Sequence, residues 1–367
     1  AITGVKAYLN EEKKENASLA LLGELDALRI PEHAYVNPET DAAHCCGHHA
    51  QMAGVFGAAL ALTVPEIAEK LGGQVVFFAT PAEEYGEIEF KNQLREQGKI
   101  RYGGGKCELI RTGAFDDIDL CLAHHIQPGD EIQVGSGTGN GFVSKVIRYL
   151  GKAAHAAGAP DKGVNALSAA SLGLQALGLN RETFRDEDCV RVHPIITKGG
   201  NLVNVIPDEI VIETLVRDAA KKTDRSFQAG AVAMGAKVEI TTLPGYLPTL
   251  AEQALPELKR AAELAAPEVP VREAAGHSGG STDVGDVQHL MPTGGVKGGL
   301  HQINFEVTNE EEAYIDTAKM FALAAYGLLK EKAARSKELV KNYKPVFKDS
   351  AEYTKFMEQF DSKEVLD

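Results

Sequence analysis

Two short stretches hold residue types that could do chemistry. Residues 44–49 read His-Cys-Cys-Gly-His-His, and residues 81–84 read Pro-Ala-Glu-Glu. Cys46 and His48 lie at i and i+2, so in an extended segment both side chains point to one face. A thiolate and a neutral imidazole suit a borderline-soft divalent metal. The alternative is a buried free cysteine beside a histidine that caps a helix.

Two adjacent carboxylates, Glu83 and Glu84, follow the apolar segment 74–80. Because successive residues point apart, one carboxylate can bind a metal while the other stands over a metal-bound water as general base. The alternative is a solvated surface pair. The segment 74–80 is apolar enough to be a buried strand, which favours the functional interpretation.

Further donors follow later in the chain. His124 and His125 end another apolar segment, and either could be a ligand, although isolated histidines are more often core or surface groups. His301 has little motif value alone. A site with two metal ions needs about this many donors. The combination therefore predicts a two-metal site more strongly than any of its parts.

The elements that must position these residues follow an α/β pattern. Apolar segments at 19–23, 74–80 and 119–124 are expected strands, and 49–62 is an expected helix. Such alternation indicates a mostly parallel sheet, whose sites form at the carboxyl ends of the strands. The candidate donors fall at these ends.

The pattern changes at the glycine-rich residues 135–141, which by composition form a flexible hinge. Beyond it we expect a β-α-β-β-α-β order, the split ferredoxin-like arrangement. The expected elements are strands at 142–150, 193–198, 209–217 and 237–243 and helices at 163–177 and 221–234. Helices at 250–265 and 309–332 and a strand at 301–307 would follow.

Four regions follow from this pattern. The first part of a catalytic α/β domain spans 1–140, and an inserted domain spans 141–248. The second part of the catalytic domain spans 249–332, and a charged, helical C-terminal tail spans 333–367.

Bulk properties exclude some functions. The 367 residues suit two domains, and the net charge of −14 argues against binding a nucleic-acid backbone. The longest apolar run, about 52–64, is too short to span a bilayer, and no leader is visible. Five cysteines in a chain of this length do not suggest a disulfide framework, so we expect a cytoplasmic protein.

Together these stretches resemble the cocatalytic metallopeptidase and amidohydrolase family that includes aminoacylase, carboxypeptidase G and acetylornithine deacetylase. Within it, the sequence is most similar to the aminobenzoyl-glutamate and auxin-conjugate amidohydrolase branch. The resemblance runs in the family's order from about residue 18 to 330. The matching stretches are 24–28, 44–48, 81–84, 125–128, 151–156, 160–167, 193–217, 281–286 and His301.

The resemblance implies a metal site and its ligands. The implied ligands of two divalent ions are Cys46, His48, Glu84, His125 and His301, with Cys46 as the bridge. By softness Zn²⁺ fits a thiolate best, and Mn²⁺, Co²⁺ or Ni²⁺ would fit the same ligands. Glu83 is the implied general base, and Asp26 would orient a metal ligand.

The resemblance also implies a role for the inserted domain. In relatives this domain mediates dimerisation and covers the site like a lid. Its histidine, here His155, reaches the partner's active site and stabilises the oxyanion, with Asn204 nearby. Arg217 is a candidate clamp for a substrate carboxylate, and its alternative is a surface arginine at a strand end.

The sequence departs from the family in several places. His49 stands where Asp or Asn is common, and it could perturb the site or compete as a ligand. Glu24 replaces a more usual Asp, and His124 stands beside the ligand His125. Only 25 residues precede Asp26, whereas relatives carry several dozen. Either the sequence begins inside the protein, or this member lacks part of the catalytic domain's edge.

We therefore expect an α/β, zinc-peptidase-like catalytic domain interrupted by an α+β ferredoxin-like dimerisation domain. The expected activity is metal-dependent hydrolysis of the amide bond in an N-acyl amino acid or a small peptide-like conjugate, by a homodimer. Two alternatives stay open: a dipeptidase with the same machinery, and a catalytically weak relative that binds a metal or ligand. The acyl group and the amino acid are not encoded in any motif.

Overall fold

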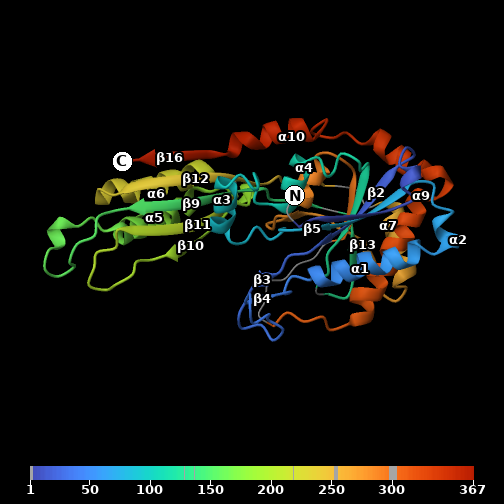
Figure 1. The fold of residues 1–367 in the computed structure, drawn as a ribbon, viewed down its shortest axis with the longest axis horizontal. Helices are drawn as coiled ribbons and strands as arrows, with labels where there is room; N and C mark the ends of the chain where they lie inside the picture. The colour runs from blue at the N-terminus through green and yellow to red at the C-terminus, as the bar shows by residue number, and fades with distance from the viewer. Residues whose placement is uncertain (1–2, 128, 136, 218, 252–254, 297–303) are drawn as a thin grey trace.

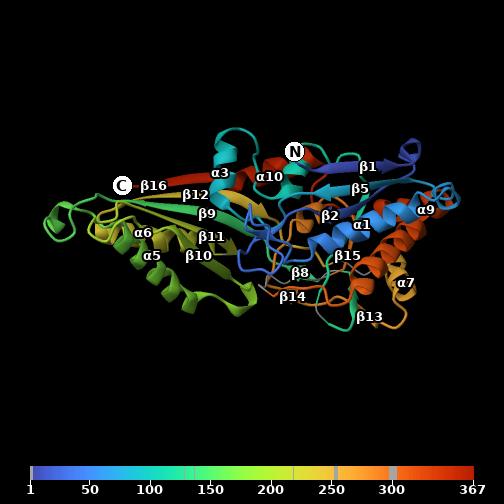
Figure 2. The ribbon, with the colours of Figure 1, turned by 60° about the horizontal axis from the view of Figure 1, so that its bottom comes forward.

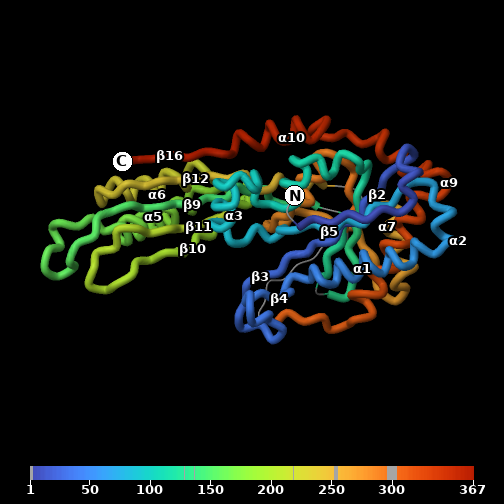
Figure 3. The backbone as a smooth tube through the Cα atoms, viewed as in Figure 1, coloured from blue at the N-terminus to red at the C-terminus, as the bar shows by residue number. Residues whose placement is uncertain are grey.

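The computed structural model describes residues 3–127, 129–135, 137–217, 219–251, 255–296 and 304–367. The molecule is elongated, with one sheet and its helices at each end of the long axis (Figures 1 and 3). The expected strands and helices near Cys46, His48, Glu83, Glu84 and His125 are present, with boundaries shifted by a few residues at most.

The larger sheet has seven strands in the order β1-β5-β2-β6-β15-β7-β13. Its inner strands β5, β2, β6 and β15 are parallel, and β1 pairs antiparallel with β5 at one edge. The strands are β1 (Val5–Leu9), β2 (Ser18–Glu24), β5 (Gln74–Thr80), β6 (Leu120–His124), β7 (Ile132–Val134), β13 (Val271–Glu273) and β15 (Thr293–Val296).

Helices cover both faces of this sheet, because its central strands are apolar on both sides. In β2, Leu19 and Leu21 lie in the core with α1, α7 and α9, whereas Ala20 and Leu22 lie in the core with α4, α8 and α10. The helices are α1 (His48–Leu62), α4 (Gly105–Arg111), α7 (Pro256–Ala265), α8 (Val284–Gln288), α9 (Thr317–Asn342) and α10 (Ser350–Met357). The result is a three-layer α/β/α half.

The smaller sheet has five antiparallel strands in the order β10-β11-β9-β12-β16. Its two helices pack along one face of it (Figure 2). The elements are β9 (Phe142–Leu150), α5 (Ala166–Asn180), β10 (Arg191–Lys198), β11 (Glu209–Arg217), α6 (Ala220–Met234), β12 (Lys237–Tyr246) and β16 (Ser362–Leu366). The first six give the β-α-β-β-α-β order, so the expected fold class is confirmed.

Short elements complete the chain. They are η1 (Glu11–Lys13), β3 (Leu28–Arg29), β4 (Ala42–Ala43), α2 (Pro65–Ala68), α3 (Ile88–Glu96), β8 (Thr138–Gly139), η2 (Pro160–Lys162), η3 (Arg181–Thr183), η4 (Asp186–Asp188), β14 (His277–Ser278), the π-helical η5 (Glu311–Asp316) and η6 (Glu358–Phe360). Within the described residues, no helix is both long and apolar enough to cross a membrane.

Several expectations about local structure were wrong. The C-terminal tail is only partly helical, because after α10 the residues of β16 pair with the open edge of β12. The glycine segment 135–141 is not a free hinge: β8 pairs with β14, and a Cβ on Gly137 would lie 2.2 Å from the carbonyl oxygen of Gly276. Those glycines permit close backbone approach rather than flexibility.

Two other segments also differ. Of the strand expected at 301–307, residues 301–303 lie outside the described residues, and residues 304–307 form no strand. The long C-terminal helix α9 is broken where Glu331, Lys332 and Ala333 have positive φ angles of 54°, 57° and 55°. The expected end of this helix at residue 332 falls within that break.

Candidate metal centre

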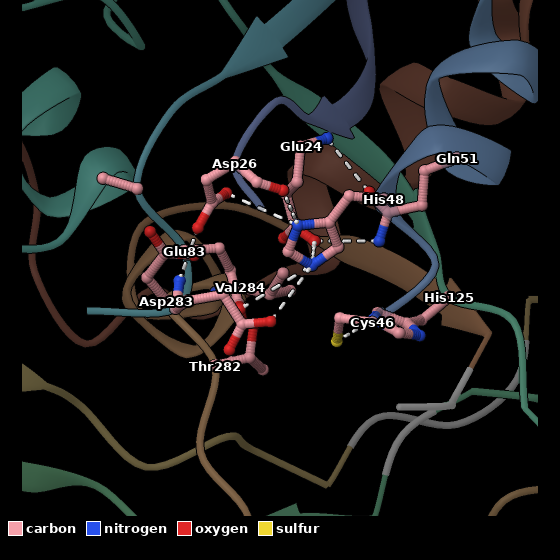
Figure 4. Close-up of polar contacts among 12 residues, drawn as sticks. Glu24, Asp26, Cys46, His48, Gln51, Glu83, His125, Thr282, Asp283 and Val284 are labelled. Atoms are coloured by element: carbon pink, nitrogen blue, oxygen red, sulfur yellow. Dashed lines mark hydrogen bonds and ion pairs between the residues drawn. The ribbon is translucent and has the colours of Figure 1, made fainter. Parts of the chain in front are cut away.

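The candidate residues meet at the carboxyl edge of the seven-stranded sheet. Glu24 ends β2, Glu83 follows β5, and His125 follows β6. Cys46 and His48 lie at the start of α1, which packs over β2. Parallel strands bring their carboxyl ends to one edge, so Cys46 and His125, which are 79 positions apart in the chain, come into contact (Figure 4).

Cys46, His48 and His125 form one group with the geometry of metal ligands. Their donor atoms all lie within 4.8 Å of one another. The Cys46 Sγ lies 3.3 Å from the His125 Nε2. Both Cys46 and His48 are buried, so this group of soft donors is shielded from water.

The two nitrogens of His48 face different partners. Nδ1 lies 3.0 Å from the carbonyl oxygen of Asp26 and 3.5 Å from its carboxylate. Nε2 lies 3.1 Å from the Glu24 carboxylate and 4.0 Å from the carboxylates of both Glu83 and Glu84. A histidine whose Nδ1 hydrogen is bound in this way presents Nε2 to a metal. Nε2 therefore faces a group of carboxylates, which fits a position near which a metal would bind.

The electrostatics of the cluster favour a cation at this place. Burial opposes protonation of His48, but its contacts with Asp26, Cys46 and Glu24 raise its pKa to about 12. Burial also opposes ionisation of Asp26, yet the contact with His48 lowers its pKa to about 2. Burial and the neighbouring Glu24 and Asp283 raise the pKa of Glu83 well above its usual range. The same carboxylates would be compensated by divalent ions.

Sequence reasoning missed a buried lysine beside the cluster. Lys106 is fully buried, and its Nζ lies 2.6 Å from both the Glu24 and the Asp283 carboxylates. Gln51 donates to the other oxygen of Glu24 at 2.8 Å, so that carboxylate is held between Lys106, Gln51 and the Nε2 of His48. The available signal was the run of three glycines at 103–105: a Cβ on Gly105 would lie 1.5 Å from the Pro81 carbonyl oxygen.

A cavity of about 540 Å³ opens beside these residues. Its wall includes Glu24, Cys46, Glu83, Glu84 and His125, together with glycine- and serine-rich residues of the 278–284 loop. Arg217, at the end of β11 in the other half of the molecule, also lines it. A cavity of this size accepts a small molecule rather than a folded protein.

Arg217 reaches the cavity from the five-stranded half. Its Nε donates to the Ser281 hydroxyl at 2.9 Å, and its guanidinium lies 5.5 Å from the centre of the Phe142 ring. Burial and then the nearby Arg191 lower the pKa of Arg217. An anionic ligand in the cavity would therefore stabilise the cationic form of Arg217.

His155 and Asn204 are not brought to the cavity. Both are exposed on the five-stranded half, where the backbone N–H of Ala156 donates to the Asn204 carbonyl at 3.0 Å and His155 pairs with Val205. His155 and Asn204 thus lie next to each other although 49 positions separate them in the chain. His301 lies outside the described residues.

The neighbouring histidines have different surroundings. His124 is buried, lies against the Phe321 ring at 6.0 Å, and burial lowers its pKa to about 3. It is His125, not His124, that contacts Cys46. His49 is half-buried, with its ring 5.6 Å from that of His44 and 6.2 Å from Phe305. His49 is not a member of the two candidate metal groups, which contain Cys46, His48, His125, Glu24 and Glu83.

Comparison with known proteins gives a consistent assignment. The model of peptidase family M20/M25/M40 matches residues 20–326. The chain is 28% identical over 320 residues to an Xaa-Arg dipeptidase of Mus musculus, covering 82% of this chain and 67% of that protein. It is 31% identical over 226 residues to the N-acetyl-L-cysteine deacetylase of Bacillus subtilis, covering 59% of this chain and 49% of the deacetylase.

Solved structures share the fold at low identity. A dinuclear metal-binding peptidase of Bacillus subtilis from family M20 superposes with a TM-score of 0.56 at 21% identity, covering 89% of this chain and 85% of that one. An aminobenzoyl-glutamate utilization protein from Klebsiella pneumoniae gives a TM-score of 0.59 at 20% identity, covering 89% and 75%. Both halves of the molecule are therefore part of one shared architecture.

Proposed function

The chain belongs to peptidase family M20/M25/M40, and from that premise we propose that it hydrolyses the amide bond of an N-acyl amino acid or a small peptide-like conjugate. The family match agrees with the resemblance seen in the sequence, and relatives include a deacetylase and a p-aminobenzoyl-glutamate hydrolase. The observation that carries the proposal is the Cys46, His48 and His125 group beside the Glu83 carboxylate on the wall of one cavity.

Two divalent ions are the proposed cofactor. Cys46, His48, Glu84 and His125 would hold them, together with His301. Bound ions would polarise the scissile carbonyl and make a bound water more acidic. A thiolate donor favours Zn²⁺, and Mn²⁺, Co²⁺ or Ni²⁺ suit the same donors.

Glu83 is the proposed general base. Its carboxylate would take a proton from the attacking water and later deliver it to the leaving amine. Burial next to Glu24 and Asp283 raises the pKa of Glu83, so its carboxylate binds a proton more strongly than an exposed glutamate does. Asp26 would hold the His48 Nδ1 hydrogen, so that Nε2 stays directed at the metal position.

Substrate contacts are proposed from both halves. Arg217 would bind the substrate carboxylate, which is supported by its place on the cavity wall and by the lack of an ion pair to any described residue. In a homodimer, the exposed His155 and Asn204 of one subunit would complete the other subunit's cavity and stabilise the oxyanion. Their exposure in a single chain is compatible with that role.

A dipeptidase is the second candidate function. It is favoured by the Xaa-Arg dipeptidases of mouse and human, which align over 82% of this chain. The same proposed groups would act, and only the contacts to the substrate's amino end would differ. For location we propose the cytoplasm, since all five cysteines are free thiols, as expected in a reducing compartment.

Substitution of Glu83 tests the proposal. The metal-loaded protein is assayed on N-acetyl amino acids, p-aminobenzoyl-glutamate and dipeptides that end in arginine. Glu83→Gln should lower kcat by roughly 10²–10⁴-fold, because a general base contributes that much, without loss of bound metal. Glu96→Gln, an exposed glutamate of α3, is the matched control and should keep full activity. Full activity in Glu83→Gln, or no turnover by the metal-loaded wild type, would overturn the proposal.

A further inference from the structure

The turn that carries Glu83 has an unfavourable backbone. Ala82 has a φ of 58° and Tyr85 a φ of 52°, so non-glycine residues on both sides of the glutamate pair adopt left-handed conformations. Each such residue costs about 1 kcal/mol or more, and it persists only where surrounding contacts hold it. The direction of the Glu83 side chain depends on those contacts.

The seven-stranded half supplies some of these contacts. The N–H of Glu84 donates to the Asp26 carboxylate at 2.8 Å, and the N–H of Gly105 donates to the Ala82 carbonyl at 3.2 Å. Neither contact holds the carbonyl of Glu83 itself.

That carbonyl is held from the five-stranded half. Tyr246 is the last residue of β12 and is 4% exposed. Its hydroxyl donates to the carbonyl of Glu83 and lies 3.3 Å from the carbonyl of Ala82. The close approach needs a glycine opposite the ring, because a Cβ on Gly104 would lie 2.2 Å from the Tyr246 Cε1.

Two neighbouring aromatic rings fix the position of Tyr246. Its ring lies 4.6 Å from that of Phe142 and 5.5 Å from that of Tyr85, and Tyr85 lies 5.1 Å from Phe142, all edge to face. Tyr85 in turn donates to the Pro244 carbonyl at 2.6 Å. Phe142 begins β9 and Tyr246 ends β12, so the rings pack where the chain passes between the two halves.

We propose that Tyr246 is a positioning residue for Glu83, through which the five-stranded half sets the direction of the general base. This inference rests on the proposed function, because it assumes that Glu83 takes the proton from water. Among the described residues, Tyr246 forms its hydrogen bonds to backbone carbonyls and none to the side chain of a proposed metal ligand. Without its hydroxyl, the carbonyl of Glu83 loses its hydrogen bond from the other half of the molecule, and the carboxylate no longer points in one direction.

The test removes one oxygen atom. Tyr246→Phe keeps the ring and its packing, and Tyr149→Phe is the matched control. Tyr149 is fully buried in the five-stranded half, and its hydroxyl donates to the Phe227 carbonyl at 2.8 Å. Each variant loses one buried hydrogen bond to a carbonyl, so both should show a similar fall in Tm, on the order of a few degrees.

The kinetic constants separate positioning from stability. Tyr246→Phe should lower kcat at least about 10-fold with KM and metal content unchanged, since a misdirected base affects the chemical step more than binding. Tyr149→Phe should keep the kcat of the wild type. Equal kcat values in the two variants would overturn the inference.

Two further variants, Gly104→Ala and Glu83→Gln, distinguish failure of the role of Tyr246 from failure of the proposed function. Gly104→Ala displaces the Tyr246 ring and leaves its hydroxyl, so it should also lower kcat; wild-type kcat in this variant, with a lowered Tm, would contradict the proposal. If Glu83→Gln is fully active, the proposed function fails. If Glu83→Gln is inactive while Tyr246→Phe equals Tyr149→Phe, only the role of Tyr246 fails.

Discussion

Among the described residues, each half of the molecule buries one lysine, and the charges of these two lysines are compensated differently. In the five-stranded half, Lys145 is 1% exposed and lies 2.8 Å from the Asp224 carboxylate and 2.7 Å from the Thr242 hydroxyl. In the seven-stranded half, Lys106 is fully buried between two carboxylates, Glu24 and Asp283. One carboxylate balances Lys145, whereas Lys106 leaves a negative charge over.

The difference shows that the fold buries more carboxylates than lysines near the candidate metal centre. A buried charge without a counter-ion is costly, so a packed core keeps its charges paired, as around Lys145. Around Lys106 the surplus carboxylate, Glu24, also contacts the Nε2 of His48, the nitrogen turned toward Glu83 and Glu84. Carboxylates beside soft donors are what a site for divalent cations requires, and the described residues of the five-stranded half form no such group.

Replacing each of the two buried lysines should give the largest difference in stability and activity between the two halves. Lys106→Met strands two buried carboxylates and should cost about 5 kcal/mol of unfolding free energy, with loss of activity. Lys145→Met strands one carboxylate that is partly solvated, and should cost about 3 kcal/mol or less with activity retained. Denaturant titration measures the unfolding free energy of each variant, and kcat measures its activity. Equal stability losses and equal activity in the two variants would contradict the difference between the two lysines.

Two glycines should also differ between the halves. Gly105→Ala places a Cβ 1.5 Å from the Pro81 carbonyl oxygen, beside the turn of Glu83, and should cost about 3 kcal/mol. Gly178→Ala in α5 meets nothing within 4 Å and should gain up to about 1 kcal/mol, because alanine favours a helix. Thermal unfolding compares the two, and a stable Gly105→Ala would contradict the described packing at the site.

Arg217 tests whether the five-stranded half contributes to substrate binding. Arg217→Met should raise KM about 10-fold for substrates with a free carboxylate, with little change for their amides, because the ion pair is lost. Arg148→Met, whose side chain pairs with Glu89 and Glu209 rather than with the cavity, is the control. An equal rise in KM for substrates with a free carboxylate and for their amides would contradict the proposal that Arg217 binds the substrate carboxylate.

The last prediction concerns the pH dependence of stability. Burial raises the pKa of Asp286 to about 8, and the carboxyl contacts the Tyr353 hydroxyl at 2.8 Å. The group is protonated in both states below pH about 4, so its stabilising effect is complete there. As pH rises the unfolded state loses the proton first, and stability falls by about 1 kcal/mol per pH unit until pH passes about 8. Asp286→Asn should reduce the fall of Tm with rising pH between pH 6 and 8. The same fall of Tm with pH in this variant and in the wild type would contradict the prediction.

Much of the architecture is predictable because periodicity and burial are local signals. Strands β5, β9 and β11 have the bounds expected from apolar runs, and α1 and α6 begin one residue from expectation. β15 was not expected because Thr-Gly-Gly-Val offers little apolar pattern, although its place in the sheet is central. β16 was missed because a charged strand at a sheet edge resembles a polar tail.

The site was predictable only where motifs are contiguous. Cys46, His48, Glu83 and Glu84 sit in short motifs, and the structure brings them together with His125. The contact of Tyr246 with Glu83 spans 163 positions, so no local pattern announces it. The burial of Lys106 likewise depends on partners from β2 and from the loop before α8. Such residues can be identified only from the three-dimensional structure, because their partners are distant in the sequence.

Metal content tests the central claim most directly. Elemental analysis per chain should find about two divalent ions in the wild type and far fewer in Cys46→Ser, because the thiolate is the proposed bridge. Cys189→Ser, a partly exposed thiol of the five-stranded half, is the control and should keep both ions. No specific metal in the wild type, before or after reconstitution, would contradict the account.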